Sequence, residues 1–187
     1  MPDNQYIGLL RGINVGGRNV IRMTDLKKSL EQMGFSDVAT YIQSGNILFR
    51  SDEKNKNRLE QILEEGLSKH FGTNLRLVLI TPVQLEKIIM EAPAGFGKEP
   101  EIYRYDVLFL KEPLTSAESI SDISFKEGVD SVTAGTGVLY FSRLISKAAQ
   151  SHIEKFIRLP VYQNLTIRNW NTTIKLLALA ELRSENV

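Results

Sequence analysis

Two arginines flank a glycine-rich segment near the start of the chain. Arg11 ends a short apolar run, and Gly12, Gly16 and Gly17 separate it from Arg18. Glycine lets other groups approach the backbone closely, and successive backbone amides can form a concave anion site. Guanidinium groups bind phosphate or carboxylate through paired hydrogen bonds. The segment therefore predicts an anion-binding loop. The alternative is a tight crossover whose arginines are solvated.

Two later segments have a similar character. Gln43-Ser44-Gly45-Asn46 lies between two β runs, and Arg168-Asn169-Trp170-Asn171-Thr172 joins a predicted strand to the last helix. Turn formation, helix capping and core packing by the tryptophan are the structural alternatives. All three segments carry side-chain amides, and the first and third also carry arginine, which favours one shared site. The predicted ligand-binding residues are Arg11, Gly12, Asn14, Gly16, Gly17, Arg18, Gln43, Ser44, Asn46, Arg168, Asn169 and Trp170.

The residues of this chain do not define a reaction. The glycine-rich segment lacks the Lys-Ser/Thr of a P-loop and the Gly-x-Gly-x-x-Gly of a dinucleotide site. Ser44 is outside a Gly-x-Ser-x-Gly motif, and no histidine is obviously placed to activate it. With no cysteine and no metal-spaced cluster, we predict no metal and no cofactor. The catalytic residues are unknown, and an enzyme using the same pocket stays an alternative.

Hydrophobic periodicity predicts the same element order twice. Strands are expected at 6–11, 38–42, 47–50 and 75–80, and again at 103–110, 131–134, 138–142 and 165–169. Helices between and after them give β-α-β-β-α-β-α in each half. We predict an α+β fold, a tandem duplication of ferredoxin-like units, each followed by an extra helix. The expected divisions are 1–92, a linker at 93–102, and 103–187; the alternative is one mixed sheet without internal symmetry.

The three segments also carry a resemblance to a known family. Leu9-Leu10-Arg11-Gly12-Ile13-Asn14-Val15-Gly16-Gly17, Tyr41-Ile42-Gln43-Ser44-Gly45-Asn46-Ile47-Leu48-Phe49 and Arg168-Asn169-Trp170-Asn171-Thr172 are similar to segments of a bacterial domain-of-unknown-function family. Together they span nearly the whole chain. The resemblance implies a soluble protein and supplies no activity.

Composition narrows the classes of partner. A net charge of +1 argues against a duplex-DNA partner, and no apolar run approaches the roughly 20 residues of a membrane span. Without a signal-like start, a cytoplasmic location is expected. Single-stranded nucleic-acid binding stays an alternative because Phe49, Tyr140 and Phe141 lie on hairpin strands. The last helix is apolar nearly all round, so it is expected between the halves or in a homo-oligomer contact.

Overall fold

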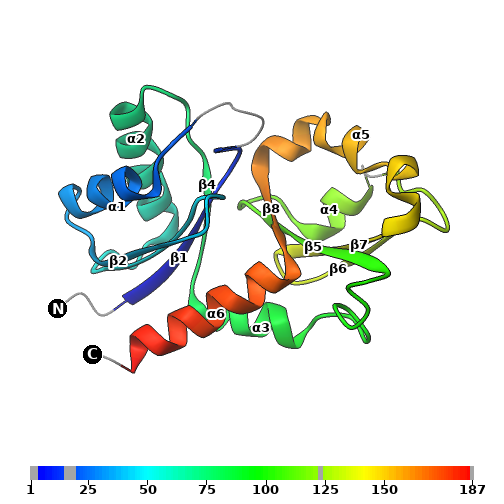
Figure 1. The fold of residues 1–187 in the computed structure, drawn as a ribbon. Coiled ribbons are helices and arrows are strands. Elements are labelled where there is room, and N and C mark those ends of the chain that lie inside the picture. Colours follow the sequence, from blue (N-terminus) through cyan, green and yellow to red (C-terminus); the bar gives the residue numbers. More distant parts are fainter. Residues whose placement is uncertain (1–3, 15–19, 122–123, 186–187) are drawn as a thin grey trace. The chain divides into compact units, whose positions relative to one another are not determined.

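The computed structural model of the chain describes residues 4–14, 20–121 and 124–185. The chain forms two compact units (Figure 1). Unit 1 contains residues 1–84 and 178–187, and unit 2 contains residues 85–177. The boundaries 1–92, 93–102 and 103–187 follow element order alone and stay a prediction. None of the helices in the described ranges is long and apolar enough to cross a membrane.

Unit 1 contains a four-stranded antiparallel sheet in the order β2-β3-β1-β4. Two helices cover one of its faces (Figure 1). The core between them includes the fully buried Leu26, Leu63 and Phe49. Its elements are β1 Asn4–Leu10, α1 Met23–Gln32, β2 Ser36–Tyr41, β3 Asn46–Ser51, α2 Lys56–Phe71 and β4 Leu77–Ile80.

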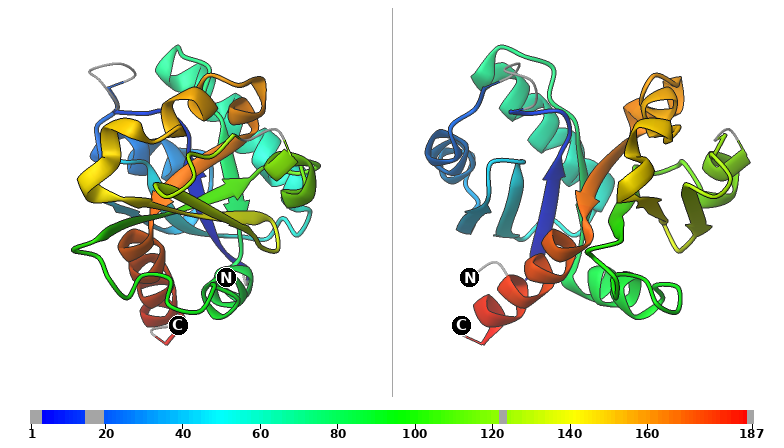
Figure 2. Two further views of the ribbon diagram at one scale, coloured as in Figure 1. Left: turned by 90° about the vertical axis from the view of Figure 1, so that its right-hand side faces the viewer. Right: turned by 45° about the vertical axis from the view of Figure 1, so that its right-hand side comes forward.

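Unit 2 repeats the arrangement with the sheet order β6-β7-β5-β8. Its elements are β5 Tyr103–Leu110, α4 Ser116–Ser121, β6 Asp130–Ala134, β7 Val138–Leu144, α5 Ile153–Ile157 and β8 Leu165–Asn169, with 3-10 helices at Ile145–Gln150 and Pro160–Asn164. One sheet face packs against α4 and α5, around the buried Phe141 and Phe156 (Figures 1 and 2). The duplicated α+β fold is therefore confirmed.

The division between the two units falls within two helices, α3 (Pro82–Met90) and α6 (Trp170–Ser184). From Leu85 onward α3 belongs to unit 2, where the Tyr140 hydroxyl donates to the Ile88 carbonyl. From Ala178 onward α6 belongs to unit 1. There the Gln5 side-chain amide donates to the Ala180 carbonyl at 3.1 Å.

Local signals in the sequence account for several helix ends. Thr81-Pro82-Val83-Gln84 has the spacing of a capping box. The box is present, because Thr81 Oγ1 accepts from the Gln84 amide and Gln84 Oε1 accepts from the Thr81 amide. Thr115 and Glu118 make the same reciprocal bonds. The long helix α2 ends at Gly72, which has the left-handed conformation typical of a helix C-terminus.

The spacing of Ala149, Ile153 and Phe156 predicts one helix that begins at Ser146, and this prediction is wrong. The segment is a 3-10 helix with a non-helical Lys147, followed after a break by the short α5. The break has a physical cause at Asp130, whose Oδ2 accepts from the His152 backbone amide at 2.8 Å. Ser151 is extended, and its hydroxyl accepts from the Ile153 amide, so α5 starts afresh at this point.

Two glutamates of α2 protect the edge strand β4. Glu60 Oε1 accepts from the Leu79 backbone amide at 2.8 Å, and Glu64 Oε1 accepts from the Leu77 amide at 2.9 Å. Their spacing of four residues puts both carboxylates on the same helix face, and Glu60 is buried. Backbone amides on the outer side of an edge strand have no neighbouring strand to bind, and the two carboxylates supply their hydrogen-bond acceptors.

We expect Glu60→Ala to lower the free energy of unfolding by about 1–3 kcal/mol, because the buried Leu79 amide loses its acceptor. Glu60→Gln keeps an oxygen acceptor and should cost less. The exposed Glu65 gives the control Glu65→Ala. Urea unfolding followed by circular dichroism measures all three variants. Equal losses for Glu60→Ala and Glu65→Ala would contradict this role of the edge carboxylate.

Candidate functional site

Unit 2 contains a cavity where one strand of its sheet stops short. The register pairs Leu110 with Leu165 and Asp106 with Asn169, so Tyr103, Arg104 and Tyr105 of β5 extend beyond the end of β8. A cavity of about 360 Å³ lies at this step, which we call the notch cavity. This volume is within the range of small-molecule sites, roughly 300–1,000 Å³.

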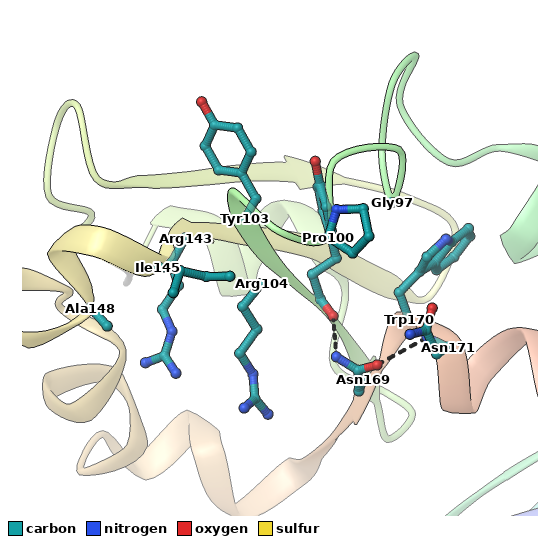
Figure 3. A pocket seen from close by; sticks show the side chains of 11 residues that line it. Gly97, Pro100, Tyr103, Arg104, Arg143, Ile145, Ala148, Asn169, Trp170 and Asn171 are labelled. Atoms are coloured by element: carbon teal, nitrogen blue, oxygen red, sulfur yellow. Dashed lines mark hydrogen bonds between the residues drawn. The ribbon is translucent and has the colours of Figure 1, made fainter.

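Two arginines from neighbouring strands enter the notch cavity. Arg104 of β5 and Arg143 of β7 are direct partners in the antiparallel register, and both line the cavity. Cross-strand partners have side chains on the same face of a sheet, and like charges there repel. Figure 3 shows the two guanidinium groups running side by side in the same direction, whereas Tyr103 points the other way. The arrangement concentrates positive charge at one point.

The two arginines differ in how their charge is compensated. Arg104 Nε donates to Asp106 Oδ2 at 2.8 Å, and this bond raises the pKa of Arg104 above its ordinary value. Within the described residues the Arg143 side chain has no hydrogen bond and no ion pair, and its Nε atom is buried. The guanidinium N–H groups of Arg143 are therefore available to donate hydrogen bonds to a ligand.

Further polar atoms without partners lie close by along the chain and the sheet. Within the described part of the chain, Asp106 Oδ1, Asp130 Oδ1 and His152 Nδ1 are buried and make no hydrogen bond. Asp130 is the cross-strand partner of Arg143, and its other oxygen accepts from the His152 amide. Buried polar atoms are nearly always paired, so such a concentration is typical of a functional region.

Asn169 and Trp170 border the same cavity, in different roles. The Asn169 side chain donates to the Tyr105 carbonyl at 3.0 Å and accepts from the Asn171 amide at 3.0 Å, as the dashed lines in Figure 3 show. Asn169 therefore extends the strand ladder and caps α6. Trp170 packs edge-on against Phe96, with ring centroids 5.1 Å apart. Within the described residues its indole N–H makes no hydrogen bond.

Arg168 does not line the notch cavity. It alternates with Asn169 along β8, so its side chain leaves the opposite face of the sheet. It is 5% exposed and donates to Thr166 Oγ1 and the Ile167 carbonyl. Burial lowers the pKa of Arg168 to about 10, which still leaves the guanidinium charged at neutral pH.

In unit 1 the structure brings the first predicted loop against the hairpin turn. The Leu10 amide donates to the Gly45 carbonyl at 2.8 Å, and Asn14 Nδ2 donates to the Gln43 carbonyl at 2.8 Å. Asn14 also closes its own loop by accepting from the Ile21 amide. The polar groups of Asn14 thus hold the fold, and Arg11 and Gly12 lie beside them.

The remaining candidates of unit 1 divide between the hairpin and an undescribed segment. Asn46 is fully buried, and its amide donates to Ser44 Oγ and to the Tyr41 carbonyl. Gly16, Gly17 and Arg18 lie outside the described residues. Convergence of the glycine-rich loop with Arg168, Asn169 and Trp170 stays a prediction.

Sequence reasoning missed the two arginines of the notch cavity. The available signal was an arginine within each of two mostly apolar or aromatic strands, in Tyr103-Arg104-Tyr105 and Ser142-Arg143-Leu144. Such a charge inside a strand indicates either a solvated face or a site. Among residues 4–14, 20–121 and 124–185, no group of three or more His, Asp or Glu side chains is placed to hold a metal ion.

Comparison with known protein families assigns the chain to one of them. Residues 4–140 match the family described as a protein of unknown function, DUF1697, and the chain belongs to this family. The chain is also similar to a solved structure, that of the conserved bacterial protein SP0830 from Streptococcus pneumoniae. The sequences are 27% identical over 95% of this chain and 98% of that one, with a TM-score of 0.80. No curated protein sequence matches the chain.

Proposed function

We propose that this chain binds a small anionic, phosphate- or nucleotide-like molecule in the notch cavity of unit 2. The observation that carries the proposal is Arg143, a cavity-lining guanidinium that faces another arginine across the register and has no partner within the described residues. An anion between Arg104 and Arg143 replaces their repulsion with two charge-assisted interactions. Among the described ion pairs, Asp106 pairs with Arg104, and none involves Arg143.

The surroundings favour a small molecule that carries a phosphate group over a simple inorganic anion. The cavity is large enough for a small molecule, and aromatic side chains form part of its wall. Planar guanidinium groups match the oxygen geometry of phosphate and carboxylate. The Trp170 indole supplies a further donor at the same cavity.

The test is calorimetric titration of inorganic phosphate into the protein. Arg143→Gln should weaken binding about 10- to 100-fold, since a hydrogen bond to a charged group contributes roughly 1.5–3 kcal/mol. Arg158→Gln removes the same charge from an exposed position of unit 2 and should leave the affinity unchanged. Equal affinities for the wild type and Arg143→Gln would overturn the proposal.

A second location for the same function is the glycine-rich loop of unit 1. Its support is the pair of hydrogen bonds that fixes Arg11–Asn14 beside Gln43 and Gly45. Gly12 has positive φ, and no atom of the described residues lies within 4 Å of a Cβ built on it. In the same titration, Arg11→Gln would weaken binding if this loop holds the phosphate.

Single-stranded nucleic acid is not favoured by any observation of this kind. The aromatic residues that suggested it, Phe49, Tyr140 and Phe141, are at most 1% exposed. Bases stack on exposed rings, so these three side chains cannot form such a platform.

A further inference from the structure

A second cavity adjoins the notch cavity in unit 2. It has a volume of about 240 Å³, and Tyr103 and Tyr105 line both cavities. Because residues alternate along β5, these tyrosines and Arg104 leave opposite faces of the sheet. We call the second space the tyrosine cavity. Tyr103 and Tyr105 are the described lining residues that the two cavities share, so a ligand that occupies both cavities must pass these two side chains.

The tyrosine cavity combines aromatic rings with hydroxyl groups. Tyr105 and Ser131 are both cross-strand partners of Ser142, so the three form a row on one face of the sheet. Phe96 packs against Tyr105 and Tyr140, with centroid distances of 4.9 and 5.4 Å, and fixes the aromatic wall. Thr133 adds a further hydroxyl.

Charge distinguishes the two cavities. Arg104 and Arg143 line the notch cavity, whereas the tyrosine cavity has the carboxylate of Glu99 and no lysine or arginine among its described lining residues. A carboxylate accepts hydrogen bonds and repels a second anion. A ligand that fits both cavities is therefore negative at one end only, and its other end offers hydroxyl donors and an apolar face.

We propose that the ligand is a phosphorylated sugar, with the phosphate on Arg104 and Arg143 and the sugar hydroxyls in the tyrosine cavity. This inference rests on the proposed function. The C–H face of a sugar ring packs on aromatic side chains, and its hydroxyls pair with Glu99 and the serine row. The same chemistry is offered by a free sugar phosphate and by the ribose phosphate of a nucleotide.

The experiment compares three probes, inorganic phosphate, ribose 5-phosphate and adenosine monophosphate, by calorimetry on the full chain. Ribose 5-phosphate is expected to bind about tenfold tighter than phosphate, because one or two added hydrogen bonds contribute that much. Glu99→Gln should remove most of this gain and leave phosphate binding unchanged. Glu101→Gln is the matched control, since Glu101 is exposed and lines neither cavity.

The outcomes separate the two proposals. Equal affinities for phosphate and ribose 5-phosphate would overturn the sugar site and leave the anion site standing, as would a gain that Glu99→Gln does not reduce. Failure of all three probes to bind would overturn both. Tighter binding of adenosine monophosphate than of ribose 5-phosphate would assign the sugar phosphate to a nucleotide. The reverse order would assign it to a free sugar phosphate.

Discussion

Replacing Gly97 with alanine should lower the free energy of unfolding of unit 2 by about 2–5 kcal/mol. Gly97 has a φ of +82°, where an L residue is strained by roughly 1–2 kcal/mol. A Cβ at this position would lie 2.2 Å from Trp170 Nε1 and 2.3 Å from Cδ1. The indole is also packed against Phe96, so it cannot move without cost, and overpacking adds about 1–3 kcal/mol.

Gly95 provides a matched control for this substitution. It has the same φ of +82°, but no atom of the described residues lies within 4 Å of a Cβ built on it. Gly95→Ala should therefore show the backbone strain alone. Urea unfolding followed by circular dichroism gives the difference between the two variants, and Trp170→Ala combined with Gly97→Ala should recover the clash energy. Equal losses for Gly95→Ala and Gly97→Ala would show that the indole does not occupy the place described.

Replacing Gly45 with alanine should destabilise unit 1 by a similar amount, about 2–5 kcal/mol. Gly45 has a φ of +72°, and a Cβ there would lie 2.5 Å from Ile13 Cδ1 and 2.9 Å from Leu10 Cβ. Both neighbours are 1% exposed, so the packed core cannot yield. The same contact fixes the hairpin turn against the glycine-rich loop.

The corresponding hairpin of unit 2 supplies the control. Gly137 has a φ of +71°, and in the described part of the chain nothing lies within 4 Å of a Cβ built on it, so Gly137→Ala should cost only about 1–2 kcal/mol. Chemical unfolding of both variants measures the contrast. Shortening the obstructing side chain in Ile13→Val with Gly45→Ala should recover part of the loss. If Gly137→Ala cost as much as Gly45→Ala, the clash with Ile13 would not be the cause.

The sequence could predict the fold where local chemistry decides the structure. The strands Tyr103–Leu110 and Leu165–Asn169 occur with the predicted bounds, because residues that disfavour strands flank their apolar runs. The capping box at Thr81 was equally readable. The helix predicted from Ser146 failed because Asp130, distant in sequence, takes the His152 amide. A contact of that kind leaves no local signal.

The candidate site was only half predictable. Asn169 and Trp170 border the notch cavity, as residues at the end of a strand can. Arg168 is separated from it by the alternation of side chains along β8. Arg104 and Arg143 come together only through the register of β5 with β7. That register depends on pairing between strands that are distant in sequence, and no motif in either strand predicts it.

The most direct measurement records the side-chain Nε–Hε signals of the arginines by NMR during titration with inorganic phosphate. The signals of Arg143 and Arg104 are predicted to shift together and saturate with one dissociation constant, while the signal of the exposed Arg158 stays in place. Saturable shifts confined to Arg11, or no saturable shift at Arg143, would contradict the anion site in the notch cavity.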